Sequence, residues 1–82
     1  MTVHLVFSQR GLAACSAVRR AQDPVVLLGD GVYAHSAADS EVRILDEDLT
    51  IRGIVTHDAT TVTYDALLEL CAQHNPIVSW ND

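Results

Sequence analysis

The chain has 82 residues, a length that fits one small domain. Its formal charge is −6, with five arginines and no lysine, which argues against direct nucleic-acid binding because phosphate contacts need clustered basic side chains. No apolar run approaches the roughly 20 residues that span a bilayer, and no signal-peptide pattern opens the chain. We therefore expect a cytoplasmic protein that does not bind membranes.

The first third of the chain predicts a strand, a helix and a second strand. Residues Thr2–Phe7 form a β-rich run with alternating apolar side chains. Ser8 is a suitable N-cap for a helix over Gln9–Ala21, although Gly11 lowers the helical propensity of that segment. The unbroken apolar run Val25–Leu28 is typical of a strand buried at the centre of a parallel sheet.

The middle of the chain predicts a turn, a strand and a short helix. A turn over Gly29–Gly31 follows the buried strand, with glycine at positive φ. The segment Val32–Ser40 could hold one helical turn but nothing longer. A second interior strand is expected over Glu41–Leu45, and three acidic residues then open a helix to about Arg52, which Gly53 ends.

The last third continues the alternation. Residues Ile54–Asp58 predict a loop or a short extended piece, and Thr60–Thr63 is β-rich. Thr63 can cap a helix over Tyr64–His74, which carries an apolar stripe, and Ile77–Trp80 reads as a last strand.

This order of elements predicts the fold class. Alternating strands and helices indicate an α/β domain over residues 1–82, with an open sheet of four to five mostly parallel strands and helices packed on it. Val25–Leu28 should be the most buried strand, flanked by Thr2–Phe7 and Glu41–Leu45.

Neither a metal nor a cofactor is expected. Cys71 lies on the apolar stripe of the last predicted helix and is interpreted as a core residue. Cys71 and His74 could form half of a metal site, but His4, His35 and His57 share no ligand spacing with them. The Gly29-Asp30-Gly31 turn lacks the third glycine and the lysine of nucleotide-binding loops.

Three segments carry a family resemblance. Leu27–Ala34 reads LLGDGVYA and resembles the LL-x-DGVYA signature of the TusB/DsrH family. Leu45–Gly53 is similar to that family's L-x-EDL-x-x-RG segment. Val62-x-Tyr64-Asp65 before a Leu-rich helix, then His74 and a terminal Ser79-Trp80, match its C-terminal course. The resemblance covers nearly the whole chain.

The resemblance implies a DsrEFH-like fold and a subunit of a sulfur-relay complex. Such complexes pass persulfide sulfur between cysteines, for wobble-uridine 2-thiolation of tRNA or for dissimilatory sulfur oxidation. The implied partners are other DsrE-like subunits and a DsrC/TusE-like sulfur acceptor. The alternative left open is a non-catalytic interaction subunit that supports the active site of a partner.

Cys15 is the candidate persulfide carrier, because its place resembles that of a cysteine that some DsrH-type members carry on this helix. Arg19, four residues on, could lower the pKa of the Cys15 thiol. The competing interpretation makes Cys15 a small core residue beside Leu12 and Val18, since free cysteine is often buried. Either way, whether the chain is a sulfurtransferase depends on this thiol.

The turn after the buried strand is the candidate partner contact, through Asp30, Gly31 and Tyr33. Family members usually carry a full helix after this turn, and the segment Val32–Ser40 is short by comparison. We therefore expect part of one sheet face, including Val32, Tyr33, Val42 and Ile44, to be exposed. Another chain should cover such an apolar patch, which predicts a homo-oligomer with the Asp30–Ser40 loop at its interface.

Overall fold

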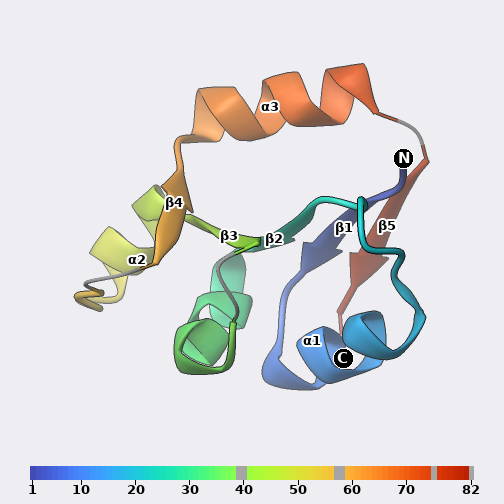
Figure 1. Cartoon of the computed structure of the whole chain (residues 1–82). Coiled ribbons are helices and arrows are strands. Elements are labelled where there is room, and N and C mark those ends of the chain that lie inside the picture. The colour runs from blue at the N-terminus through green and yellow to red at the C-terminus, as the bar shows by residue number, and fades with distance from the viewer. Residues whose placement is uncertain (39–40, 57–58, 75, 82) are drawn as a thin grey trace.

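The computed structural model describes residues 1–38, 41–56, 59–74 and 76–81, and it contains one five-stranded sheet (Figure 1). All neighbouring strands pair in parallel, in the order β4-β3-β2-β1-β5. The strands are β1 (Val3–Val6), β2 (Val25–Leu27), β3 (Val42–Leu45), β4 (Thr60–Val62) and β5 (Ile77–Trp80). The helices are α1 (Gln9–Val18), the 3₁₀ helix η1 (Gly29–Ala37), α2 (Asp46–Ile51) and α3 (Tyr64–Gln73). The predicted α/β class and parallel sheet are confirmed.

Strand β2 lies at the centre of the sheet. Its three residues, Val25–Leu27, are fully buried, and its neighbours are β1 and β3. The prediction of the most buried strand and its two flanking strands is therefore confirmed. Continuous burial on both sides is what the unbroken apolar sequence of this strand indicates.

Helix α1 begins as predicted and ends three residues early. The Ser8 hydroxyl accepts a hydrogen bond from Gly11 N at 2.9 Å, which satisfies one free donor of the first turn. The helix stops at Val18, because the chain then turns. In this turn Arg20 N donates to Asp23 Oδ2 at 3.1 Å, and Asp23 N donates to the Arg20 carbonyl oxygen at 3.0 Å. A Cβ atom at Gly11 would lie 2.8 Å from the Trp80 carbonyl oxygen, so glycine lets α1 approach β5 closely.

Residues Gly29–Ala37 form a 3₁₀ helix, so the prediction of no more than one helical turn in this region is wrong. Gly29 has φ +56°, the positive value expected of the turn. A Cβ atom at Gly31 would overlap the Val6 carbonyl oxygen, so η1 packs directly on the end of β1. This tertiary contact stabilises a helix that the local sequence does not predict.

The expected apolar patch on this face of the sheet is also absent. Val32, Val42 and Ile44 are buried, with exposed fractions of 0%, 4% and 1%, because η1 packs on the sheet and places its own Val32 in the same core cluster as Val42 and Ile44. Only Tyr33 is half-exposed, at 50%. The prediction that the shortened segment leaves sheet residues in water is therefore wrong. The homo-oligomer stays a prediction, and Asp39 and Ser40 of the proposed interface loop lie outside the described residues.

Helix α3 covers the opposite face of the sheet from α1 and η1 (Figure 1). It is one residue shorter than predicted, and the Thr63 hydroxyl caps it by accepting from Ala66 N at 3.1 Å. Leu67 is buried against Val26 and Leu45, with Leu70 and Cys71 partly buried around them. The interpretation of the apolar stripe is confirmed.

The C-terminal end of α2 lies where the sequence predicts it. Gly53 has φ +65° and follows the helix end, as expected of a glycine C-cap. The predicted loop Ile54–Asp58 lies partly outside the described residues. In the described part of the chain, no helix is long and apolar enough to cross a membrane.

Candidate functional site

Two of the family-like segments meet at the carboxyl edge of the sheet. Arg52, just after α2, donates from Nη2 to Asp30 Oδ1 at 3.0 Å. The guanidinium carbon of Arg52 also lies 5.8 Å from the centroid of the Tyr33 ring, within the range of a cation–π interaction. The structure thus joins the DGVY and EDL-x-x-RG segments in one surface, which we call the Asp30–Tyr33–Arg52 cluster.

Asp48 supports this cluster from α2. Its Oδ2 atom accepts a hydrogen bond from Gly29 N at 2.7 Å, and its Oδ1 atom lies 3.5 Å from Arg52 Nη1. The hydrogen bond with Asp30 raises the pKa of Arg52, so this arginine stays charged. The sequence predicted Asp48 only as an acidic residue at the start of a helix. It did not predict that Asp48 and Arg52 connect α2 with η1. The i, i+4 spacing of Asp48 and Arg52 was the available signal.

The three predicted contact residues differ in exposure. The side chain of Asp30 is 76% exposed, and Tyr33 is half-exposed, so both can meet another molecule. Gly31 is buried, and its close approach to Val6 explains why a glycine stands there. Arg52, whose side chain is only 21% exposed, holds the Asp30 carboxylate and the Tyr33 ring in place.

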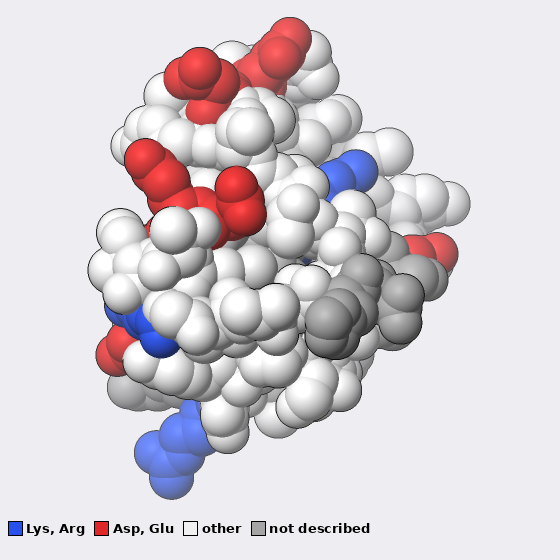
Figure 2. Space-filling model, turned by 90° about the vertical axis from the view of Figure 1, so that its left-hand side faces the viewer, with Lys and Arg blue, Asp and Glu red and all other residues white. Residues whose placement is uncertain are grey.

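Acidic side chains gather on the neighbouring surface. Figure 2 shows them over α2 and the beginning of α3. Asp46, Glu47 and Asp65 line one groove there, together with Thr63 and Tyr64. A molecule that binds across this edge would therefore meet negative charge beside the cluster.

Cys15 lies in α1 and is fully buried in the core. Burial raises the pKa of its thiol and Asp23 raises it further, while the charge of Arg19 lowers it. Leu12 is buried beside Cys15 as the core interpretation expects, but Val18 is 64% exposed. The Arg19 guanidinium pairs with Glu41 at 3.4 Å. This environment favours the core interpretation, and the role of Cys15 as persulfide carrier stays a prediction.

Cys71 is the more accessible thiol. It is partly buried on α3 and packs against the small cluster on that face of the sheet. Neither cysteine forms a disulfide. In the described part of the chain, no three His, Cys, Asp or Glu side chains are grouped to hold a metal ion.

A buried polar network escaped sequence reasoning. Trp80 Nε1 lies 3.1 Å from His4 Nδ1, and His4 Nε2 lies 3.2 Å from Asp23 Oδ2. Because an indole nitrogen only donates, His4 Nδ1 must accept, and the proton on Nε2 is donated to Asp23. The network links β1, β5 and the turn before β2, so we assign it a structural role.

Asp23 is the anchor of this network. Its carboxylate accepts hydrogen bonds from Arg20 N and Thr2 N, each at 3.1 Å, in addition to the bond from His4. The bond from Arg20, with those from His4 and Thr2, lowers the Asp23 pKa to about 2. The ionised carboxylate is therefore the form that the fold requires near neutral pH.

One comparison with known proteins, against family models, gave a match. The family model described as "DsrH like protein" matches residues 6–77, which include both segments that form the Asp30–Tyr33–Arg52 cluster. The comparison with curated proteins gave no match. DsrH-like proteins are subunits of multi-protein sulfur-relay complexes, and the expected resemblance is confirmed. The chain belongs to the DsrH-like family.

Proposed function

We propose that this chain is an interaction subunit of a cytoplasmic sulfur-relay complex and does not itself carry sulfur. The observation behind this proposal is the contrast between Cys15 and the Asp30–Tyr33–Arg52 cluster. Cys15 has no exposed surface, whereas Asp30 and Tyr33 are exposed and held in place by Arg52. The family match supports membership of such a complex.

The chemistry of sulfur transfer explains why the burial of Cys15 matters. A persulfide forms when a thiolate attacks the outer sulfur of a donor persulfide, whose S–S bond breaks as the donor thiolate leaves, so the accepting thiol must be both ionised and accessible. Burial raises the pKa of Cys15 and leaves it no contact with solvent. Transfer through Cys15 would require α1 to move away from the sheet.

The cluster has the features of a protein contact. Tyrosine and arginine are enriched among the side chains that dominate binding at interfaces. Here the arginine also fixes the ring and the carboxylate of the two exposed neighbours, so little side-chain entropy is lost on binding. We assign this surface to contact with DsrE-like subunits or with a DsrC/TusE-like acceptor.

A matched pair of tyrosines tests the contact. Tyr33 and Tyr64 are both 50% exposed, but Tyr64 lies at the start of α3, in the neighbouring acidic groove, and is not part of the cluster. With DsrE-like subunits as the binding partner, the Tyr33→Ala variant should bind at least about tenfold more weakly in calorimetry. Tyr64→Ala should bind like the unmodified chain. Equal losses for the two variants would show that the cluster is not the contact.

A competing function keeps Cys15 as the carrier and Arg19 as the group that stabilises its thiolate. One observation favours it, namely that the charge of Arg19 lowers the pKa of Cys15. Incubation of the assembled complex with a sulfane-sulfur donor, followed by peptide mass spectrometry, separates the two functions. We expect no added sulfur on Cys15 and normal transfer with Cys15→Ser. One sulfur atom on Cys15 and loss of transfer in the variant would establish the carrier.

A further inference from the structure

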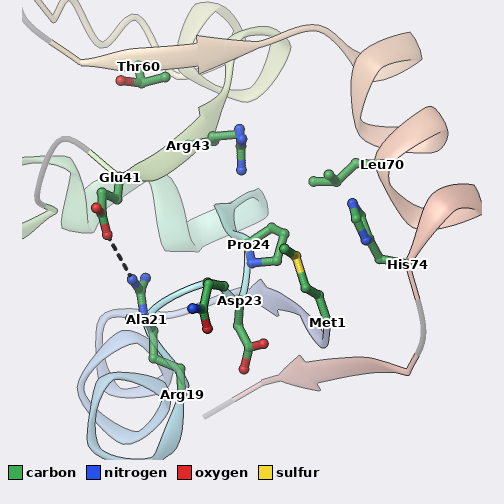
Figure 3. A pocket seen from close by; sticks show the side chains of 11 residues that line it. Met1, Arg19, Ala21, Asp23, Pro24, Glu41, Arg43, Thr60, Leu70 and His74 are labelled. Atoms are coloured by element: carbon green, nitrogen blue, oxygen red, sulfur yellow. Dashed lines mark hydrogen bonds and ion pairs between the residues drawn. The ribbon is translucent and has the colours of Figure 1, made fainter.

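An open cleft of about 410 Å³ lies at the amino ends of the strands, on the opposite edge of the sheet from the cluster (Figure 3). The segment between α1 and β2, the beginning of β3 and the end of α3 form its walls. Its size is within the usual range for sites that bind small molecules. Its apolar side chains are Met1, Ala21, Pro24 and Leu70, and its charged ones are Arg19, Asp23, Glu41 and Arg43.

Three of the charged side chains in the cleft are already engaged with each other or with the backbone. The Asp23 carboxylate accepts three hydrogen bonds within the fold. Arg19 and Glu41 form an ion pair at 3.4 Å, drawn as a dashed line in Figure 3. The charge that remains available is the guanidinium of Arg43.

Arg43 stands in the middle of β3 and is flanked by the buried Val42 and Ile44. Its side chain is partly buried on the α3 side of the sheet, where it lies beside Val26 in the strand register. Among the described residues, no hydrogen bond or ion pair is formed by this guanidinium. The guanidinium faces the open cleft, so its donors are accessible to an anion that enters there.

Helix α3 adds the second half of the arrangement. Figure 3 shows Leu70 and His74 projecting from α3 toward Arg43 across the cleft. The His74 ring can donate a further hydrogen bond, and Leu70 supplies apolar surface beside it. The Arg43 guanidinium, the His74 ring and the apolar side chain of Leu70 thus line the same cleft.

We propose that this cleft binds a small organic acid. Its carboxylate lies on Arg43, whose planar guanidinium matches a carboxylate with two parallel hydrogen bonds. Its short apolar chain packs against Met1, Pro24 and Leu70. The inference is independent of the proposed function, since it concerns the other edge of the sheet and needs no cysteine.

The probe is butyrate, added to the isotopically labelled chain at constant ionic strength and followed by amide chemical shifts. We expect saturable shifts that centre on the amides of Arg43, Leu70 and His74. Butyrate should bind about tenfold more tightly than acetate, because two additional methylene groups are buried. Inorganic phosphate should bind more weakly than butyrate, because it has no apolar part.

Two arginine variants make the test specific. Arg43→Gln should weaken butyrate binding at least about tenfold, and Arg43→Lys, which keeps the charge but lacks the fork, should weaken it by about threefold or more. Arg10→Gln is the matched control, because Arg10 is exposed on α1 outside the cleft. The amide spectrum of each variant reports whether the fold is intact.

The proposal is overturned by any of three results. Shifts that rise linearly without saturation would show that butyrate has no site. Equal binding by the Arg43→Gln and Arg10→Gln variants would remove the role of Arg43. Phosphate binding that exceeds butyrate binding would show that the apolar wall takes no part.

Discussion

The two faces of the sheet differ in how completely they are covered. The face under α1, η1 and α2 carries a large buried cluster that runs from Val6 through Leu27 to Ile44. The face under α3 has Val26, Leu45 and Leu67 as its buried cluster, and other apolar side chains there are only partly covered. The first face therefore supplies most of the stability, and the second retains surface for another molecule.

Truncation of one leucine on each face should give the largest contrast. Leu27→Ala removes a fully buried side chain of β2, and we expect a loss of about 4 kcal/mol in the free energy of unfolding. Leu70→Ala removes a partly buried side chain of α3 and should cost about 1 kcal/mol. Urea denaturation measures both. Similar losses would mean that α3 is packed as tightly as the opposite face.

Two glycines sharpen the comparison within the covered face. Gly31→Ala places a methyl group against the Val6 carbonyl and should cost about 3 kcal/mol, because β1 and η1 must separate. Gly53→Ala is the control, since its φ is positive but nothing lies within 4 Å of the added methyl group. Its cost should be about 1 kcal/mol, from backbone strain alone. Thermal unfolding of the two variants gives the difference, and equal costs would argue against the close contact of η1 with β1.

Local patterns were sufficient to predict most of the fold. The alternation of strands and helices, the continuous apolar run of β2 and the capping residues Ser8 and Thr63 each depend on neighbours in the sequence. The 3₁₀ helix η1 was missed because Gly31 acts through a carbonyl 25 residues earlier in the chain, at Val6. The spacing of apolar residues within Gly29–Ala37 does not indicate a contact with a residue so distant in the chain.

The candidate sites likewise combine features that the local sequence predicts with features that depend on distant contacts. Asp30 and Tyr33 could be placed at the sheet edge because that edge follows from strand order. The partners of Arg52 and the isolation of Arg43 depend on the register between elements, which the sequence pattern does not contain. The depth of Cys15 in the core depends on how closely α1 approaches the sheet, and the contact of Gly11 with Trp80 sets that distance.

The link between η1 and α2 should contribute a moderate stabilisation. Asp48→Ala removes the acceptor of the Gly29 N–H group, and we expect a loss of about 2 kcal/mol, typical of a hydrogen bond to a charged group. Glu47→Ala is the control, since Glu47 is exposed in the same first turn of α2 and contributes through the helix dipole alone. Its loss should be about 0.5 kcal/mol. Equal losses in urea denaturation would show that the Gly29 bond contributes nothing.

The last effect appears only in acid and concerns Asp23, which anchors the covered face at its amino edge. Its pKa is lowered to about 2 in the folded chain, against an ordinary value of about 3.9 in an unfolded one. The unfolded state therefore binds the proton first, so the stabilisation from Asp23 is complete above about pH 5 and is lost as the pH falls toward 2.

Two measurements check this pH dependence. The side-chain carboxyl carbon resonance of Asp23 should titrate near pH 2, and the unfolding free energy of the Asp23→Asn variant should fall less steeply than that of the unmodified chain between pH 5 and pH 2. The difference between the two profiles isolates Asp23, because every other carboxylate is common to both. Titration near pH 4, with parallel profiles, would mean that the bonds from Arg20, His4 and Thr2 do not favour the ionised form. The amino edge of the covered face would then be held by apolar packing alone.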